Sequence, residues 1–148
     1  LLPVNLYGPR DNFNPNSSHV IPALIKKIND AKKSNKPSFT VWGTGNASRE
    51  FLYVDDASDG IIKAAKHYNE SNPINLGSGR EIKIKELVNI IKDLIDYKGE
   101  IIWDPEKPDG QPRRCLDTSK AKEKFGFEAG VSLEEGLRKT IYWYLSNN

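Results

Sequence analysis

The chain has 148 residues, 37% hydrophobic and 28% charged, which is enough for one buried core and too few for two ordinary domains. Lys and Arg number 22 against 20 Asp and Glu, and this net charge of +2 excludes the strongly basic class of nucleic-acid binders. The single cysteine favours a reducing, cytoplasmic location, and no apolar run approaches the roughly 20 residues that a membrane helix needs.

The amino-terminal segments predict a strand, a loop and a helix. Residues 1–7 are apolar and run into a Gly-Pro pair, which predicts a buried strand that ends in a turn. Residues 10–18 are rich in Asn, Pro and Ser and predict a loop. Apolar residues at helical spacing predict a helix over 19–34, with Ser17 or Ser18 as its N-cap.

Two short β patterns, at 39–42 and 50–54, flank the sequence Gly43-Thr-Gly-Asn46. This arrangement predicts a β-hairpin. A second Gly-Ser-Gly turn follows a short strand at 74–76. Both turns lack the third glycine of a dinucleotide-binding fingerprint, so hairpin turns are the better interpretation of both.

The helices of the middle and end of the chain have clearer signals. A helix begins at Asp55-Asp56 and ends near Lys66; its predicted inward residues are Ile61, Ile62, Ala64 and Ala65. The clearest amphipathic pattern covers 83–96. A short helix is expected from Asp117 or Thr118 to Gly126.

The capping-box pattern Ser132-Leu-Glu-Glu135 predicts a last helix, with Leu137, Ile141, Tyr144 and Leu145 facing inward. A strand is expected at 100–103 and a loop at 104–114, where three prolines and five charges occur. Strands and helices alternate, but the strands are few and short. The fold class is therefore α/β with α+β character, and not a complete doubly wound sheet.

Few side chains of the sequence are obvious catalytic groups. His19 opens a helix directly after a polar loop, where an imidazole can serve as an acid or base; the alternative is a partly exposed helix-initiating residue. His67 is expected at the surface near a helix end. Cys115 follows two arginines that could lower the pKa of its thiol, although a packing role is the simpler interpretation. Two distant histidines and one cysteine do not make a zinc site.

Several cations could bind an anion such as a diphosphate: Lys26, Lys27, Arg49, Lys107, Arg113 and Arg114. Asp109 would suit a ribose diol, and Trp42 offers a flat face for a base or a sugar. The alternative is a solvated basic surface, and the charge count alone favours it because Lys is spread along the whole chain.

The order of the motifs is more informative than any single residue. N-L-Y-G-P at 5–9, D-N-F-N at 11–14 and S-H-V-I-P-A-L at 18–24 resemble the GDP-L-fucose synthase family, a branch of the extended short-chain dehydrogenase/reductase superfamily. Further matching segments follow in the order typical of that family: V-W-G-T-G at 41–45, R-E-F-L-Y-V-D-D at 49–56, I-N-L-G-S-G at 74–79, K-P-D-G-Q-P-R at 107–113 and L-D-T-S-K-A at 116–121.

The resemblance implies an NADPH-dependent enzyme that epimerises C3 and C5 of GDP-4-keto-6-deoxy-D-mannose and then reduces the C4 ketone. It implies that His19 is one acid–base partner of the epimerisation and that Cys115 is not the catalytic cysteine. It also places the segment Pro3, Val4, Asn5 and Leu6, together with His19, beside the nicotinamide of NADP.

For the substrate, the resemblance implies that Lys27, Trp42 and Arg49 surround the GDP-sugar and that Lys107 and Asp109 lie in a loop over the nucleotide. Lys27 departs from the family pattern, in which arginine is frequent. The family's glycine-rich loop, Tyr-x-x-x-Lys pair and catalytic cysteine are not in the sequence.

We therefore expect residues 1–148 to form one substrate-binding, carboxy-terminal domain with residual strands of a Rossmann sheet, without the dinucleotide-binding domain and inactive by itself. The whole enzyme is expected to be a homodimer. The alternatives are the substrate domain of another nucleotide-sugar epimerase or dehydratase, and a non-catalytic nucleotide-binding module.

Overall fold

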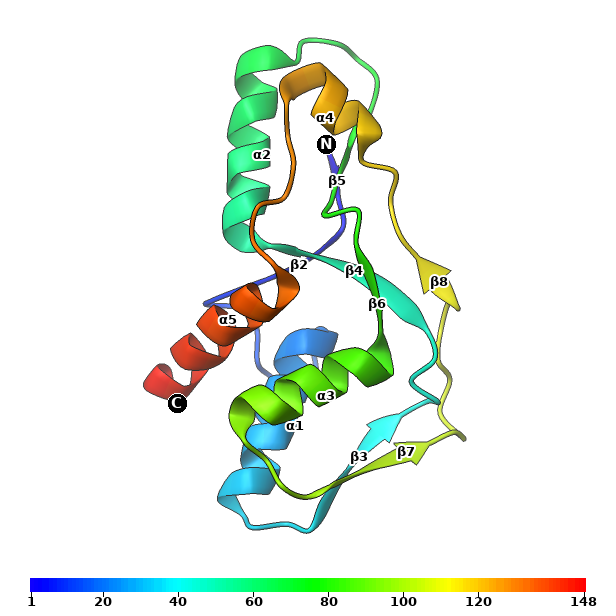
Figure 1. Cartoon of the computed structure of the whole chain (residues 1–148), viewed down its shortest axis with the longest axis vertical. Coiled ribbons are helices and arrows are strands. Elements are labelled where there is room, and N and C mark those ends of the chain that lie inside the picture. Colours follow the sequence, from blue (N-terminus) through cyan, green and yellow to red (C-terminus); the bar gives the residue numbers. More distant parts are fainter.

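The computed structural model describes all residues from 1 to 148 and has an elongated shape (Figure 1). Its helices are α1 (Val20–Lys33), α2 (Val54–His67), α3 (Ile84–Ile95), α4 (Ser119–Phe125) and α5 (Leu133–Asn147). Its strands are β1 (Leu2–Pro3), β2 (Asn5–Tyr7), β3 (Ser38–Trp42), β4 (Ser48–Tyr53), β5 (Asn75–Leu76), β6 (Glu81–Lys83), β7 (Glu100–Asp104) and β8 (Arg113–Arg114). No helix is long and apolar enough to cross a membrane.

The strands form small sheets that are mainly parallel. β1 pairs with β5, β3 pairs with β7, and β4 pairs with both β2 and β8, all in parallel; only the β4–β6 pair is antiparallel. Parallel strands need crossover connections, and helices supply most of them. The predicted α/β class is therefore confirmed.

The hairpin predicted around Gly43–Asn46 is wrong. β3 and β4 do not pair: Val41 of β3 lies opposite Trp103 of β7, and Leu52 of β4 lies opposite Leu6 of β2. The glycine turn instead carries the chain from one sheet into another, and the Gly77–Gly79 turn does the same between β5 and β6. Local turn chemistry signals a change of direction, but distant strands decide the pairing.

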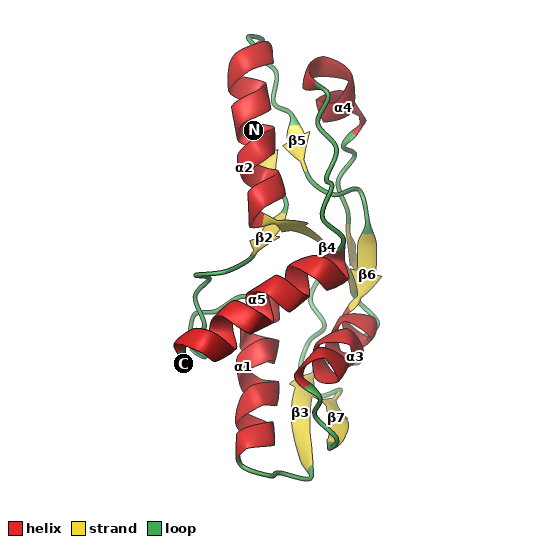
Figure 2. Ribbon diagram, turned by 60° about the vertical axis from the view of Figure 1, so that its left-hand side comes forward, coloured by secondary structure: helices red, strands yellow, loops and turns green.

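The molecule has two hydrophobic cores. Figure 2 shows α2, α4 and β5 toward one end and α1, α3 and β3 toward the other. The larger one has 18 buried residues and lies among α1, α3, α5 and the strands β3 and β4. The smaller one has 9 buried residues and joins α2, α4 and β5. Strand β4 serves both cores, because successive side chains alternate between faces: Leu52 enters the smaller core, whereas Phe51 and Tyr53 enter the larger one.

The strongest helix predictions are confirmed. α3 buries Leu87, Val88 and Ile91 completely, as its pattern requires. α5 begins at its predicted cap, where the Ser132 hydroxyl accepts a hydrogen bond of 3.2 Å from the backbone N–H of Glu135. The start of α1 differs from the prediction, because the N-cap position falls on His19 and no side chain caps it.

The inward face predicted for α2 is largely wrong. Ile61 and Ile62 are each 52% exposed, and the helix packs through Ala57, Gly60 and Ala64. A Cβ at Gly60 would collide with the side chains of Leu76 and Phe127, so small residues define the packed face. At the end of α5, Leu145 is likewise exposed, against the prediction.

Residues 1–7 do not form one buried strand. They form the short strands β1 and β2, of which only Val4 and Tyr7 are buried. Leu1 and Leu2 are 46% and 53% exposed, and β1 has β5 as its one neighbouring strand. The loop predicted at 104–114 is also interrupted, because β8 adds to the edge of β4.

Candidate functional site

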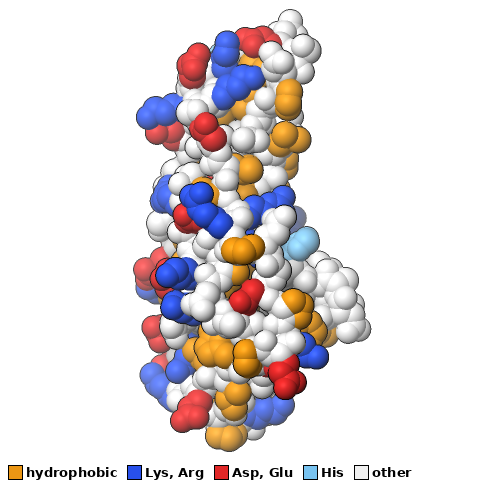
Figure 3. Space-filling model, turned by 90° about the vertical axis from the view of Figure 1, so that its right-hand side faces the viewer, with side chains coloured by type: hydrophobic (Ala, Val, Ile, Leu, Met, Phe, Trp, Pro, Cys, Tyr) orange, Lys and Arg blue, Asp and Glu red, His pale blue; other side chains and the backbone are white.

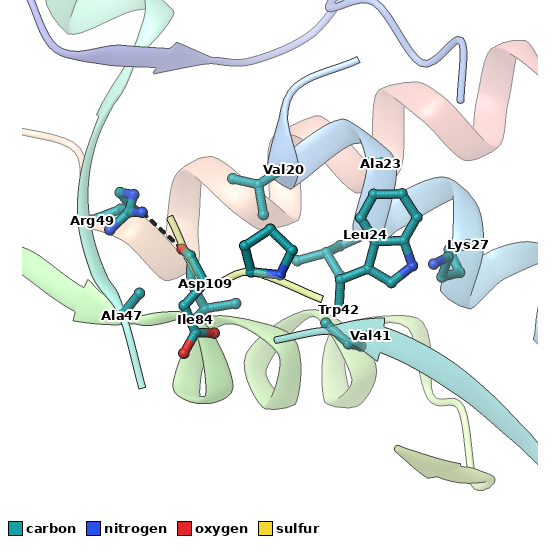
Figure 4. Close-up of a pocket in the computed structure, with 11 residues that line it drawn as sticks. Val20, Ala23, Leu24, Lys27, Val41, Trp42, Ala47, Arg49, Ile84 and Asp109 are labelled. Atoms are coloured by element: carbon teal, nitrogen blue, oxygen red, sulfur yellow. Dashed lines mark hydrogen bonds between the residues drawn. The ribbon is translucent and has the colours of Figure 1, made fainter. Parts of the chain in front are cut away.

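One cavity of about 310 Å³ gathers four of the five residues expected to bind a GDP-sugar. Figure 4 shows Lys27, Trp42, Arg49 and Asp109 around it. The remaining lining residues are mostly apolar: Val20, Ala23, Leu24, Val41, Ala47, Ile84 and Pro108. A mainly apolar cavity with a few charged groups is typical of a small-molecule site.

The fold brings these residues together from four segments. Lys27 lies on α1, Trp42 ends β3, Arg49 lies on β4, and Asp109 lies in the loop after β7. Because the chain leaves one sheet at Trp42 and enters another at Ser48, the two strands diverge there. The cavity lies at this divergence and is covered by α1 and by the proline-rich loop.

Arg49 is half-buried and its guanidinium is held by main-chain carbonyls. Its Nη1 donates to the carbonyls of Ser48 at 2.7 Å and of Gln111 at 2.6 Å, and its Nη2 donates to the carbonyl of Asp109 at 3.2 Å. A guanidinium has five N–H groups, so two remain for another acceptor. The side chain is thus oriented in advance as a fixed positive charge at the cavity.

The carboxylate of Asp109 is bound by the turn between β3 and β4. Its Oδ1 accepts from the backbone N–H of Thr44 at 2.7 Å, and its Oδ2 accepts from the Thr44 hydroxyl at 2.6 Å. The Thr44 hydroxyl and backbone bonds lower the pKa of Asp109, and Arg49 contributes less. Each oxygen keeps a second lone pair, so the contact with a ribose stays a prediction.

Trp42 and Lys107 form the outer edge of the cavity. The indole is 66% exposed, which is unusual for so large an apolar side chain. The Lys107 ammonium lies 5.8 Å from the centre of its ring, within the range of a cation–π contact. Lys107 therefore does not line the cavity but lies next to it.

Lys27 faces the same cavity from α1. Its ammonium donates a hydrogen bond of 2.9 Å to the carbonyl of Thr40, and the side chain is exposed. Two of its three N–H groups remain free for an anion.

His19 is the N-cap residue of α1 and does not line the cavity. The residue is exposed and its side chain makes no hydrogen bond, while the next residue, Val20, lines the cavity. His67 lies exposed in the last turn of α2, as predicted.

Among the four residues expected near the nicotinamide, Pro3 and Leu6 are exposed and Val4 is buried. Asn5 is half-buried and donates from Nδ2 to the carbonyl of Glu50 at 2.9 Å. Pro3 and Leu6 are thus apolar and exposed, whereas the half-buried Asn5 is polar.

The suggested activation of Cys115 is wrong. Burial raises the pKa of its thiol, and the Glu50 carboxylate raises it further; Arg113 lowers it only slightly. Cys115 is half-buried and its thiol is not activated.

Glu50, which the sequence motifs do not single out, is completely buried. Its Oε1 accepts from the backbone N–H of Gly79 at 2.7 Å, and its Oε2 accepts from that of Leu116 at 2.6 Å. The carboxylate therefore joins β4 to two loops. The sequence signal for this role is a charged residue directly before the apolar run Phe51-Leu-Tyr-Val54. A carboxylate in such a buried strand needs hydrogen-bond partners.

The surface charges are dispersed. Figure 3 shows acidic and basic side chains interspersed over one long face of the molecule, with apolar groups between them. Ion pairs of the chain include Lys124–Glu70 and Arg113–Glu81.

Comparison with known sequences identifies close relatives. Residues 1–77 match the model of the NAD dependent epimerase/dehydratase family. The chain is 48% identical to the protein named "Probable GDP-L-fucose synthase 1" of Oryza sativa subsp. japonica, over 99% of the chain and 44% of the relative. It is 41% identical to the GDP-L-fucose synthase of Escherichia coli K12, over 99% of the chain and 48% of the relative. The chain thus spans less than half the length of these relatives.

Solved structures give the same result. A GDP-L-fucose synthetase from Naegleria fowleri bound to NADP superposes with a TM-score of 0.91 at 32% identity, covering 98% of this chain and 46% of that one. The UDP-glucose 4-epimerase of Thermotoga maritima with UDP-glucose superposes with a TM-score of 0.85 at 28% identity, covering 97% and 44%.

The family model spans 77 of the 148 residues, which is more than half of the chain. The relatives confirm the resemblance to GDP-L-fucose synthases, and the solved structures confirm the Rossmann-like character of the fold. The chain belongs to the NAD dependent epimerase/dehydratase family.

Proposed function

We propose that this chain is the GDP-sugar-binding part of an NADPH-dependent GDP-L-fucose synthase, which epimerises and reduces GDP-4-keto-6-deoxy-D-mannose. The observation that carries the proposal is the cavity between α1 and the diverging strands β3 and β4, with Arg49 and Lys27 as cations and Trp42 as a flat apolar face. The relatives named GDP-L-fucose synthase, at 41–48% identity, support the choice of substrate.

A nucleoside diphosphate sugar offers complementary groups. Its diphosphate carries negative charge that the oriented Arg49 and the mobile ammonium of Lys27 can neutralise. Lys107 adds a third cation at the edge. We assign the base or the sugar to the exposed face of Trp42 and the ribose diol to Asp109.

Epimerisation needs an acid–base group close to the sugar ring. A proton on a carbon next to a ketone is acidic, because the enolate that forms spreads its charge onto oxygen. We assign one of the two proton transfers to His19, which is exposed, makes no side-chain hydrogen bond and directly precedes the cavity-lining Val20. An imidazole that is not engaged elsewhere is free to act as an acid or a base.

A nicotinamide cofactor is implied by the family. The exposed apolar Pro3 and Leu6, with the polar Asn5 between Val4 and Leu6, suit the edge of a planar ring that carries an amide. When bound, NADPH supplies the hydride for reduction of the C4 ketone. The chain has no Gly-x-Gly-x-x-Gly loop, so we assign most cofactor binding to the part of the relatives that this chain does not match. A homodimeric whole enzyme, a cytoplasmic location and a single-domain role for residues 1–148 stay predictions.

The test is a calorimetric titration of the chain with GDP and with UDP. We expect GDP to bind more tightly than UDP. We expect Arg49→Ala to weaken GDP binding by about tenfold or more, because a hydrogen bond to a charged group contributes about 1.5–3 kcal/mol. Lys63→Ala is the control, since Lys63 pairs with Asp59 on α2 outside the cavity.

A clear preference for UDP would contradict the proposal and favour a role in another nucleotide-sugar enzyme. The similarity to a UDP-glucose 4-epimerase is the reason for choosing UDP as the competing nucleotide.

A further inference from the structure

The turn between β3 and β4 binds an anion that the chain itself provides. Gly43 and Gly45 adopt φ angles of 82° and 73° on either side of Thr44. Consecutive turn residues of this kind direct their N–H groups into one concavity, which suits an anion. Here the concavity holds the carboxylate of Asp109, 65 residues further along the chain.

The contact is specific in both partners. The two carboxylate oxygens divide between two donors of Thr44: Oδ1 takes the backbone N–H at 2.7 Å and Oδ2 takes the hydroxyl at 2.6 Å. A Cβ at Gly43 would collide with Oδ1, so the carboxylate fits directly against the glycine. The backbone of Gly45 also helps to lower the pKa of Asp109.

Arg49 holds the other side of the same loop. Its guanidinium binds the carbonyls of Asp109 and Gln111, and the backbone N–H of Ser48 donates to the carbonyl of Pro112 at 2.9 Å. Arg49 and Ser48 of β4 thus bind three main-chain carbonyls of the loop. Thr44 instead binds the loop through the side-chain carboxylate of Asp109.

This loop forms a wall of the cavity. Pro108 and Asp109 line it, and Lys107 lies over Trp42. Loss of the contacts between the Asp109 carboxylate and Thr44 would loosen the wall and Lys107 together, whereas the main-chain contacts of the loop with Arg49 and Ser48 would remain.

We propose that Thr44 and Asp109 form a clasp that holds residues 105–112 as a preformed wall of the GDP-sugar cavity, which makes Thr44 a positioning residue for nucleotide binding. The inference rests on the proposed function and deepens it. A loop that is ordered before binding does not lose conformational freedom when the ligand arrives. The clasp therefore affects the affinity for the nucleotide and does not affect the rate of reaction once the substrate is bound.

The experiment compares four variants with the wild-type chain: Thr44→Val, Thr44→Ser, Asp109→Asn and Thr118→Val. Valine keeps the shape of threonine and removes the hydroxyl, whereas serine keeps the hydroxyl. Thr118 is the control, because it precedes α4 and its side chain makes no capping bond. Two measurements are made on each: hydrogen–deuterium exchange of the amides in 105–112, and the Kd for GDP.

We expect Thr44→Val and Asp109→Asn to accelerate exchange in 105–112 by about tenfold and to raise the Kd for GDP by about five- to tenfold, because each loses a hydrogen bond to a charged group. Thr44→Ser and Thr118→Val should behave like the wild type. In the full enzyme, Thr44→Val should raise KM and leave kcat unchanged.

Wild-type exchange and affinity in Thr44→Val would overturn the clasp. Faster exchange with an unchanged Kd would overturn its role in positioning. Weaker GDP binding in Asp109→Asn with wild-type binding in Thr44→Val would trace the effect to the ribose contact of Asp109 alone and overturn the positioning role of Thr44. If the wild-type chain does not bind GDP, the proposed function fails and the GDP-positioning role fails with it, while the exchange measurement still decides whether the clasp exists.

Discussion

Single side chains of the cavity differ in how firmly they are held. Arg49 donates three hydrogen bonds to carbonyls, whereas the exposed Lys27 is attached through one. A planar guanidinium fixed in this way can present two parallel N–H groups, and an ammonium acts as a movable point charge. We therefore propose Arg49, rather than Lys27, as the main determinant of where a diphosphate would lie.

The first prediction concerns His19. Once the chain is part of a complete enzyme, His19→Ala should slow epimerisation by about 10²–10⁴-fold, the usual contribution of a general acid or base. Cofactor binding should be largely unaffected. The measurement is solvent-deuterium incorporation at C3 and C5 of the sugar. His67→Ala is the control, since His67 lies exposed at the end of α2; unimpaired exchange in His19→Ala would remove His19 from the mechanism.

Ionisation of Tyr7 is expected to lower the stability of the folded chain at alkaline pH. Burial raises the pKa of its phenol, and the neighbouring Tyr53 and Asp56 raise it further. The unfolded chain would ionise Tyr7 near pH 10, its ordinary value. The stabilisation is therefore complete below about pH 10 and is lost as the pH rises toward the folded pKa.

The second prediction follows from this sign. Urea unfolding between about pH 9 and 11 should show falling stability in the wild type and a smaller fall in Tyr7→Phe. Tyr142→Phe, at a site 76% exposed, should match the wild-type profile. Equal slopes in Tyr7→Phe and the wild type would assign the alkaline loss to other groups.

At the level of elements, β4 organises the molecule. It pairs with β2, β6 and β8 and contributes to both cores. It also carries Arg49 to the cavity and, one residue later, the buried Glu50. The alternation of side chains along the strand therefore separates a ligand-facing cation from a structural carboxylate.

The third prediction tests that carboxylate. Glu50→Ala should lower the free energy of unfolding by about 3 kcal/mol or more, because two buried N–H groups lose a charged acceptor. Glu50→Gln, which keeps one acceptor oxygen, should lose less. Chemical denaturation measures both. Glu81→Ala, at an exposed ion pair with Arg113, should change stability little; a similar effect of both substitutions would contradict a special role for burial.

At the scale of the whole molecule, several large apolar side chains remain exposed in the amino-terminal segment and on α2. They are Leu1, Leu2, Leu6, Ile61 and Ile62. Parallel strands are normally covered on both faces, and β1 has one neighbour. β1 therefore lies at the edge of its sheet, with apolar side chains exposed nearby.

The fourth prediction is that the 148-residue chain does not reduce the keto sugar with NADPH, because its sequence lacks the glycine-rich loop and the Tyr-x-x-x-Lys pair. Loss of NADPH absorbance in the presence of the keto sugar is the measurement. Turnover by the purified chain would overturn the assignment of cofactor binding to another part of the enzyme.

The sequence by itself determined the helices and the order of the family's motifs. Helical periodicity identified α3, the capping pattern identified the start of α5, and ordered motifs indicated the family and the residues Lys27, Trp42, Arg49 and Asp109. These are local signals: hydrophobic spacing, a cap or a short motif can be read within a few turns of the chain.

Only the tertiary structure decided how those elements pair and what their side chains contact. Strands β3 and β4 pair with distant partners instead of with each other, the packed face of α2 follows the small residue Gly60 rather than its isoleucines, and the carboxylate of Asp109 meets Thr44 across 65 residues. Such contacts depend on which distant surfaces fit together. Strand pairing and close packing involve residues far apart in the sequence, and local propensity does not specify those partners.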